Sequence, residues 1–269
     1  MTIGFNYLGK MGQLGNQMFQ YAATLGVARY TGVTFTIPDH DEIFIDGLGN
    51  KLRVELFDCF DIKPDNVGML RTNNVLPENG YQFNRDILHV SRESDYTLHG
   101  FFQTEKYFEH CSDELRTQFT FQKNIIDECK EIIEECFENP IALHIRRGDY
   151  LINSGNHTNL GLDYYEKSLS KFDSNRQVVV FSDDADWCME QELFQDNRFI
   201  VSNGNSPYHD LYLMSQCDDF IIANSSFSWW GAWLANRGTV IAPQQWFGTD
   251  GYTKDHDTKD VVPDGWTRI

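Results

Sequence analysis

The second half of the chain alternates short apolar runs with amphipathic helical stretches. The runs are rich in Val, Ile and Phe, and polar residues, glycine or proline bound each of them. This alternation predicts parallel strands in a sheet that helices cover on both faces, an α/β fold. The expected strands are residues 141–146, 177–182, 198–202, 219–223 and 239–242. The expected helices are residues 163–172, 185–194, 208–217 and 227–236.

The first half opens in the same style and then loses its regular pattern. An apolar run at residues 3–7 leads through a glycine-rich turn into a predicted helix at residues 16–30 and a strand at residues 33–37. Residues 39–98 contain many turn formers and predict few regular elements. We therefore expect a second α/β half whose later part is irregular.

A strongly amphipathic segment separates the two halves. In residues 122–138 apolar side chains recur every three or four positions on one helical stripe. We take this predicted helix as the link between residues 1–121 and residues 122–269. Ligands of open α/β sheets bind beyond the carboxyl ends of the strands, so the residues that follow the strands are the candidates for a site.

Composition and charge narrow the class of protein. Hydrophobic residues make up 41% and aromatic residues 14% of the chain, as in a folded domain. The net charge of −18 disfavours a nucleic-acid partner, and it makes any anionic ligand depend on clustered arginines. The six cysteines form no CxxC pair, which favours reduced thiols. Without a long apolar stretch or signal-peptide features, we expect a cytoplasmic protein with no transmembrane segment.

The most informative cluster is His-Ile-Arg-Arg-Gly-Asp-Tyr at residues 144–150. It ends a predicted strand, on which His144 and Arg146 point to the same face because side chains alternate. Arg146 and Arg147 at the mouth of a parallel sheet offer permanently charged, bidentate groups to phosphates. The alternative is that both arginines only pair with surface carboxylates. Their place beside a histidine at a strand exit favours phosphate binding.

Two predicted helix starts carry further candidates. Gly15 and Asn16 belong to a glycine-rich turn, where Asn16 is a suitable N-cap and free amides attract anions. A plain tight turn explains this segment equally well. Ser225 and Ser226 open the last predicted helix and can donate hydroxyl and amide hydrogens to a phosphate. We assign the tryptophans that follow them mainly to the core.

Asp183 and Asp184 follow the predicted strand at residues 177–182. They fit helix capping, or a hydrogen bond to a base or ribose, and these two interpretations have equal weight. The Asp184-Ala185-Asp186 spacing also permits a divalent metal against a diphosphate, which is the weakest of the three interpretations.

With these clusters, the chain resembles the α1,2-fucosyltransferases of glycosyltransferase family 11. The His-x-Arg-Arg-Gly-Asp segment is shared with α1,6- and protein O-fucosyltransferases. The Gly-Asn-Gln-Met-Phe-Gln and Ser-Phe-Ser-Trp-Trp-Gly segments narrow the resemblance to family 11. The matching stretches are residues 12–22, 100–108, 142–150, 162–165, 181–187 and 224–234.

The resemblance implies a GT-B-like architecture, in which two Rossmann-type halves face a central cleft and the second half binds the donor. It implies an inverting, metal-independent transfer of L-fucose from GDP-fucose to the 2-hydroxyl of a terminal galactose in an oligosaccharide, without a cofactor. Arg146 would bind the diphosphate with support from Arg147, and Ser225 or Ser226 would contact the β-phosphate.

The resemblance also implies roles in guanosine binding and for the first half. His144 and Asp184 would contact guanosine, with Asp183 beside them. Asn16, next to Gly15, would approach the donor from the acceptor-side half. Gln13 stands where many relatives have glycine, and the chain is short for the family, so its acceptor preference stays open.

Transfer also needs a base for the proton of the acceptor hydroxyl. His157, in the loop after the arginine motif, has a suitable unperturbed pKa, and the alternative is that it serves only as a turn residue. Asp149 is the second candidate, but it fits equally well as the partner of Arg146. We rank His157 slightly ahead.

Three other interpretations remain open. A metal-dependent glycosyltransferase would use Asp184 and Asp186, and a related enzyme would take another GDP-sugar or form a different linkage. A non-catalytic nucleotide-sugar-binding protein would share the arginines and aromatics but show no turnover. An NTP-hydrolysing enzyme lacks its expected Gly-x-x-x-x-Gly-Lys-Ser/Thr segment here.

Overall fold

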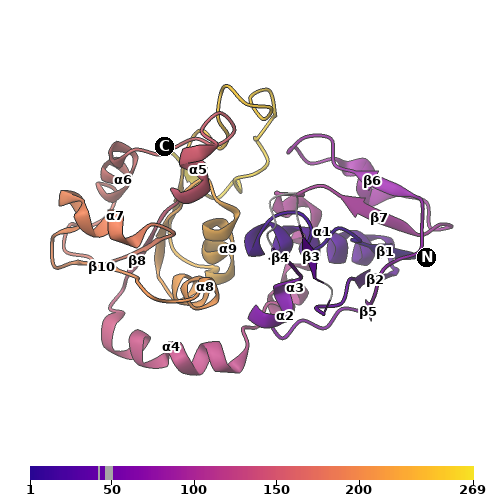
Figure 1. Cartoon of the computed structure of the whole chain (residues 1–269), viewed down its shortest axis with the longest axis horizontal. Helices are drawn as coiled ribbons and strands as arrows, with labels where there is room; N and C mark the ends of the chain where they lie inside the picture. Colours follow the sequence, from indigo (N-terminus) through magenta and orange to yellow (C-terminus); the bar gives the residue numbers. More distant parts are fainter. Residues whose placement is uncertain (42, 46–50) are drawn as a thin grey trace. The chain divides into compact units, whose positions relative to one another are not determined.

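The computed structural model of the chain forms two compact units (Figure 1). It describes residues 1–41, 43–45 and 51–269. The first unit contains Met1–Gln122 and His256–Pro263, and the second contains Lys123–Asp255 and Asp264–Ile269. The sequence predicted one change of unit, after residue 121. In the structure the chain changes unit at residue 123 and passes through the first unit once more near its C-terminus.

The first unit is built on a parallel sheet with the strand order β5-β2-β1-β7-β6. Its strands are β1 (Thr2–Gly4), β2 (Thr34–Ile37), β5 (Asn66–Val67), β6 (Val75–Pro77) and β7 (Tyr96–His99). An antiparallel pair is formed by β3 (Phe44–Ile45) and β4 (Lys51–Leu52). The helices are α1 (Leu14–Thr31), α2 (Leu56–Cys59) and α3 (Ser112–Gln118), with 3-10 turns η1 (Arg85–His89), η2 (Glu105–Tyr107) and η3 (Glu109–Cys111). The strands after β2 lie among turn formers and have no long continuous apolar run, which explains why the sequence pattern predicted few of them.

Helix α1 starts two residues before its predicted start. Gly12 has a φ of 78°, a left-handed conformation that glycine adopts without strain, and Gln13 then becomes the N-cap. Asn16 therefore lies inside the first turn, and its predicted capping role is wrong. Its side-chain oxygen instead accepts a hydrogen bond from Gln103 Nε2 at 2.8 Å. Gly32 ends the helix with a φ of 72° and donates its amide to carbonyls of the last turn.

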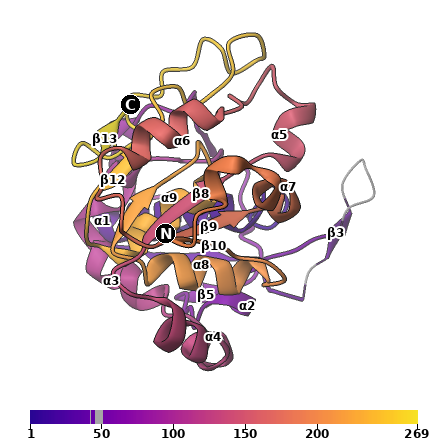
Figure 2. The same ribbon diagram turned by 90° about the vertical axis from the view of Figure 1, so that its left-hand side faces the viewer.

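The second unit contains a parallel sheet with the order β10-β9-β8-β11-β12-β13. Counted along the chain this is the Rossmann order 3-2-1-4-5-6. Figure 2 labels β8, β9, β10, β12 and β13 of this sheet. Its strands are β8 (Ile141–Ile145), β9 (Val178–Ser182), β10 (Phe199–Val201), β11 (Asp219–Ile221), β12 (Val240–Ala242) and β13 (Thr267–Arg268). Its helices are α4 (Lys123–Cys136), α5 (Gly148–Ile152), α6 (Leu162–Leu169), α7 (Ala185–Glu190), α8 (Pro207–Ser215) and α9 (Ser226–Ala235), with the 3-10 turn η4 (Glu192–Phe194).

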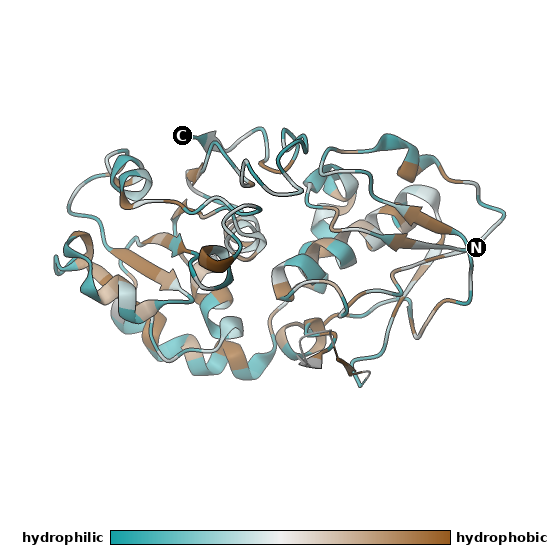
Figure 3. Cartoon of the chain, turned by 45° about the horizontal axis from the view of Figure 1, so that its top comes forward, coloured by the Kyte–Doolittle hydropathy of each residue, from teal (hydrophilic) through white to brown (hydrophobic). Residues whose placement is uncertain are grey.

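Helices cover both faces of this second sheet, as predicted. The core on one face joins Ile141, Leu143 and Ile145 of β8 to side chains of α6 and α7. The intervening His144 points to the other face, where its ring contacts Phe227 of α9. Figure 3 shows apolar residues concentrated in the strands and polar residues in the surrounding loops. Every strand predicted in this half is present within two residues of its expected ends, and the short helix α5 was not predicted.

Candidate active site

The sheet of the second unit has a switch point between β8 and β11. The chain places β9 and β10 on one side of β8, and then β11, β12 and β13 on the other. Ligands of open α/β sheets bind beyond the carboxyl ends of the strands at such a point. The arginine motif leaves β8 there, and the Asn-Ser-Ser segment leaves the adjacent β11. The topology therefore brings together two clusters that are far apart in the sequence.

Two carboxylates and an aromatic ring hold Arg146. Its Nη2 lies 2.5 Å from Asp149 Oδ1, and its Nη1 lies 3.2 Å from Asp183 Oδ2. Its guanidinium carbon lies 5.5 Å from the ring centroid of Tyr150. The side chain keeps 19% of its surface exposed. A planar cation fixed in this way, with part of its surface open, suits bidentate binding of a phosphate.

Arg147 is held against helix α7. Its Nε donates to Asp184 Oδ2 at 2.9 Å, and its guanidinium carbon lies 3.8 Å from the ring centroid of Trp187. Asp184 is the N-cap of α7 and accepts a hydrogen bond from the Trp187 amide at 3.3 Å. Asp184 thus caps a helix and pairs with an arginine at the same time.

Gly148 allows a close approach between the arginine motif and Asp183. The Asp183 carboxylate accepts a hydrogen bond from the Arg147 amide at 2.9 Å with one oxygen and pairs with Arg146 through the other. A β-carbon at position 148 would collide with Asp183 Oδ2. Any other residue at position 148 would therefore require the Asp183 carboxylate to move.

A polar pocket of about 280 Å³ opens at the carboxyl ends of β9 and β10. Its walls include the side chains of Asp184, Asp186, Ser202, Asn205 and Asp210. Burial raises the pKa of Asp210, although hydrogen bonds from Ser202 and Asn205 act in the opposite direction. Carboxylate and hydroxyl oxygens of this kind can accept hydrogen bonds from the N–H groups of a planar base.

His144 is a buried, neutral imidazole at the switch point. Burial, assisted by the positive charge of Arg146, lowers the pKa of His144 to about 3. Its Nδ1 has no hydrogen-bond partner among the described residues. A neutral ring with an unused nitrogen can form one hydrogen bond to a ligand without adding charge.

His157 contacts the arginine motif by stacking on Tyr150. The two rings stack with centroids 4.0 Å apart and planes inclined by 10°. The Tyr150 hydroxyl donates to the carbonyl of Asn224 at 2.9 Å, so this tyrosine joins the segments after β8 and β11. Burial lowers the pKa of His157, and the nearby Asp149 only partly opposes the shift. His157 is thus held as a largely neutral imidazole near neutral pH.

Helix α9 begins at the switch point with Ser226, and Ser225 is its N-cap. The Ser225 side chain is buried and makes no capping hydrogen bond, so the helix does not use it to satisfy its own amides. Unpaired amides at a helix start attract anions. Trp229 and Trp230, one turn further along, are completely buried, in agreement with the predicted core role.

The structure brings most of the predicted site residues together in the second unit. These are His144, Arg146, Arg147, Asp149, His157, Asp183, Asp184, Ser225 and Ser226. Gly15 and Asn16 belong to the first turn of α1 in the first unit, where Gly15 is buried and Asn16 is partly exposed.

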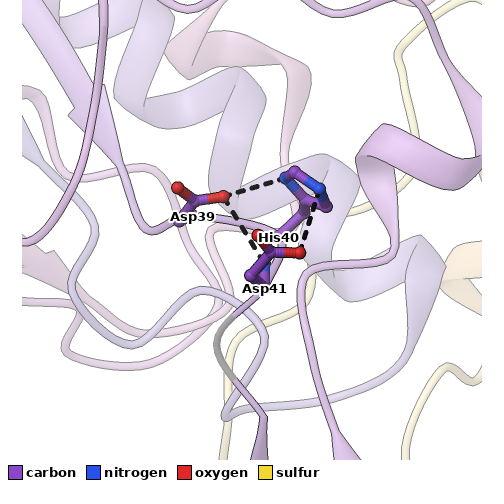
Figure 4. Close-up of side chains that lie close together, drawn as sticks. All are labelled: Asp39, His40 and Asp41. Atoms are coloured by element: carbon purple, nitrogen blue, oxygen red, sulfur yellow. Dashed lines mark hydrogen bonds and ion pairs between the residues drawn. The ribbon is translucent and has the colours of Figure 1, made fainter.

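In the described part of the chain, one group of acidic and histidine side chains has ligand atoms within 4.8 Å of one another: Asp39, His40 and Asp41 (Figure 4). His40 Nδ1 lies 2.8 Å from Asp39 Oδ1, and His40 Nε2 lies 3.2 Å from Asp41 Oδ1. These surface ion pairs account for the cluster. Of the two residues of the metal interpretation, Asp184 and Asp186, the first pairs with Arg147.

Three residues that support the site were not among the predicted candidates: Tyr150, Trp187 and Asn224. Trp187 lies three positions after the capping Asp184, on the helix face that meets Arg147, so helical spacing offered a signal. The roles of Tyr150 and Asn224 depend on the pairing of β8 with β11, which no local pattern reveals.

Two parallel Rossmann-like sheets, with a cationic site beside a helix N-terminus at the switch point of the second, define a GT-B-like glycosyltransferase. The family model of glycosyl transferase family 11 matches residues 2–269, and the chain belongs to this family.

The alignments with curated relatives cover 85% to 96% of this chain. The O-antigen biosynthesis glycosyltransferase WbnK of Escherichia coli is 30% identical, over 96% of this chain and 98% of the relative. An alpha-1,2-colitosyltransferase of Escherichia coli is 33% identical, over 96% of both chains. A galactoside alpha-(1,2)-fucosyltransferase 1 of Ateles belzebuth is 25% identical, over 85% of this chain and 65% of the relative.

Solved fucosyltransferase structures share the fold. NodZ alpha-1,6-fucosyltransferase soaked with GDP-fucose superposes with a TM-score of 0.55 at 15% identity, covering 87% of this chain and 92% of NodZ. POFUT1 in complex with GDP-fucose gives a TM-score of 0.51 at 14% identity, covering 88% and 94% of the two chains. Within the described residues, no helix combines the length and the apolar character that crossing a membrane requires.

Proposed function

We propose that this enzyme transfers L-fucose from GDP-fucose to the 2-hydroxyl of a terminal galactose in an oligosaccharide. The observation that carries the proposal is Arg146, fixed at the switch point beside the N-terminus of α9. The named activities of the family relatives, alpha-1,2 transfer of fucose and of colitose, agree with it.

The diphosphate of the donor is the group that this switch point suits best. Arg146, with Arg147 beside it, faces the leaving phosphate, and the amides and hydroxyls at Ser225 and Ser226 hydrogen-bond the β-phosphate. Negative charge grows on this phosphate as the bond to fucose breaks, so fixed donors stabilise the transition state more than the ground state. A donor contact by Gly15 and Asn16 stays a prediction from the sequence.

Guanine is assigned to the polar side of the site. Its N–H groups donate to carboxylates beside the pocket at β9 and β10, with Asp184 as the first candidate and Asp183 next to it. His144 offers its unused nitrogen as a neutral partner for guanosine. In this proposal the arginines balance the negative charge of the phosphates, and hydrogen bonds recognise guanine.

His157 is the proposed general base. Asp149 is engaged by Arg146 at 2.5 Å, so proton transfer to it would disrupt the ion pair that fixes the arginine. His157 has its pKa lowered by burial and is therefore neutral at physiological pH, as a base must be. Attack from the face opposite GDP inverts the anomeric centre.

The reaction proceeds without a metal ion in this proposal. Two arginines and a helix N-terminus supply the positive charge that a divalent ion supplies elsewhere. The cytoplasmic location expected from the sequence stays a prediction.

GDP-colitose is the second candidate donor, because a relative that is 33% identical is named a colitosyltransferase. Colitose differs from fucose in lacking the 3-hydroxyl, so both sugars offer the same anomeric centre and the same diphosphate to the site. Discrimination between them depends on a hydrogen bond to that hydroxyl.

The test is transfer from GDP-fucose, GDP-colitose and GDP-mannose to lactose in the presence of EDTA, followed by NMR of the product. We expect an α1,2-fucosylated product at a rate that EDTA does not change. Exclusive use of GDP-colitose would replace fucose as the donor sugar. Activity restored only by Mn²⁺ would overturn metal independence, and GDP binding without any transfer would favour a binding protein.

A further inference from the structure

The first unit has its own switch point, and of the residues described so far only Gly15 and Asn16, in the first turn of the helix that follows β1, have been given a role near it. In the order β5-β2-β1-β7-β6, the chain places β2 on one side of β1 and later returns β7 to the other side. Figure 1 shows β1 and β7 with β6 beyond them. The carboxyl ends of β1 and β7 are therefore the place where a parallel sheet binds a ligand.

An exposed aromatic pair lies at these two strand ends. Tyr7 follows β1 by three residues, and His99 is the last residue of β7. Their rings meet edge to face, with centroids 4.7 Å apart and planes inclined by 80°. Tyr7 keeps 40% of its surface exposed, although aromatic rings are usually buried. In the part of the chain that the structure describes, the Tyr7 hydroxyl and both ring nitrogens of His99 form no side-chain hydrogen bond.

A cation lies beside this pair without an acidic partner among the described residues. Lys10 Nζ lies 5.9 Å from the ring centroid of Tyr7 and 4.0 Å from that of Phe44. The site therefore presents a ring surface, a hydroxyl, an imidazole and an ammonium group. This set suits a neutral polyol with one apolar face.

The loop that follows His99 at the end of β7 contains a residue in a strained backbone conformation. Phe102 has a φ of 54°, in the left-handed region that a bulky residue rarely adopts, and Gly100 has a φ of 154°. The buried carboxylate of Glu78 accepts hydrogen bonds from the Phe101 and Phe102 amides at 2.7 and 2.8 Å, which keeps the loop in place. Backbone strain of this kind concentrates at ligand sites.

We propose that Tyr7 and His99 form the acceptor-sugar site, in which the apolar face of a terminal galactose stacks on the Tyr7 ring. His99 and Lys10 donate hydrogen bonds to sugar hydroxyls. The identity of the sugar as a galactoside rests on the proposed function, whereas the location of a sugar site rests on the switch point and its rings. Tyr7 is here a substrate-binding residue and takes no part in proton transfer.

The chain contains a matched control for Tyr7. Tyr30 in the last turn of α1 is also 40% exposed, and it also meets a histidine edge to face, His89, at 5.2 Å and 87°. Tyr30 precedes β2, so it lies toward the amino ends of the strands, where parallel sheets do not bind ligands. A general effect of losing an exposed tyrosine would appear equally at both positions.

The experiment compares Tyr7→Ala, Tyr7→Phe and Tyr30→Ala with the unaltered enzyme. Fucosyl transfer gives the KM for lactose, calorimetry gives the Kd for GDP, and saturation-transfer NMR measures binding of methyl β-galactoside directly. For Tyr7→Ala we expect the KM for lactose to rise about 10-fold, with the Kd for GDP unchanged, because one ring contact is lost. Tyr7→Phe keeps the ring, and we expect its KM to remain within about threefold of the original value. Tyr30→Ala should match the unaltered enzyme.

Each outcome separates this inference from the proposed function. Active enzyme whose KM for lactose is the same in Tyr7→Ala, or rises equally in Tyr30→Ala, would overturn the acceptor site and leave fucosyl transfer standing. Galactoside binding that disappears in Tyr7→Ala while no transfer occurs in any variant would support the site and remove the proposed function. Absence of saturation transfer to methyl β-galactoside in the unaltered protein would also overturn the site.

Discussion

Beyond β8 and β11, the second unit presents two arginines that carboxylates hold in place. Beyond β1 and β7, the first unit presents an exposed tyrosine, a histidine and a lysine. Both sets lie at a switch point of a parallel sheet, so the two units offer the same backbone arrangement to a ligand. The difference lies in the side chains, which suit a diphosphate in one unit and a neutral sugar in the other. Catalysis should therefore depend most on the charged switch point.

The largest effect is expected for Arg146→Ala. The variant loses a fixed charge on the leaving phosphate, so kcat/KM for GDP-fucose should fall about 10³-fold and GDP binding should weaken. Arg176→Ala is the matched control. Arg176 is 16% exposed and pairs with Asp219 at 2.5 Å, but it lies at the amino edge of the same sheet. Equal losses in steady-state kinetics of both variants would mean that ion pairing alone, and not position, explains Arg146.

The second-largest effect is expected at His157, the proposed general base. His157→Phe keeps a ring stacked on Tyr150 but removes the imidazole nitrogen, so kcat should fall about 10²-fold with the Kd for GDP unchanged. In the unaltered enzyme, kcat should rise with pH and level off, because the neutral imidazole is the active form. Burial lowers the pKa of His157, so the midpoint should lie below 6.5.

The pH profile also separates the two candidate bases. His157→Phe should lose the rise with pH, and Asp149→Asn should keep it. The opposite pattern would assign the base to Asp149 and leave His157 as a packing residue.

A smaller effect is expected from Gly148→Ala. The added β-carbon displaces the Asp183 carboxylate, which holds Arg146 and the Arg147 amide, so calorimetry should show about 10-fold weaker GDP binding. Gly155→Ala is the control, because its β-carbon meets no atom closer than 3.6 Å. Unchanged GDP affinity in Gly148→Ala would show that the Asp183 contacts do not organise the arginines.

The last prediction concerns the stability of the first unit, through the carboxyl of Glu78, which holds the loop after β7. Burial raises the pKa of this carboxyl from 4.5 to about 7, against the hydrogen bonds from Phe102 and Phe101. The folded protein therefore binds this proton more tightly than the unfolded chain does. The resulting stability is complete below pH 4.5 and is lost as the pH rises through 7.

Glu78→Gln removes that pH dependence. The free energy of unfolding of the unaltered protein, relative to the variant, should fall by roughly 2 kcal/mol between pH 5 and pH 8 in urea titrations. Glu93→Gln, at an exposed position of the same unit, serves as the control. A constant difference between the unaltered protein and Glu78→Gln across this range would show that Glu78 ionises normally.

The arrangement of the second half followed from its sequence because its signals are local. Strands such as β8 are continuous apolar runs, and its helices begin at residues such as Ser206, whose side chain accepts from the His209 amide, followed by Pro207. The first half resisted prediction because β5, β6 and β7 lie among turn formers and lack the continuous apolar runs that mark the strands of the second half, so they depend on their neighbours in the sheet.

The sequence by itself determined the alternation of elements, the family, and the cluster of arginines at a strand exit, since each of these is written in consecutive residues. Only the tertiary structure decided which groups meet. It placed Asn224 beside Tyr150 and His99 beside Tyr7. It also buried His144, which lowers the pKa of this imidazole to about 3. Burial and contact between distant segments arise from the order of strands in a sheet, which residue spacing along the chain does not specify.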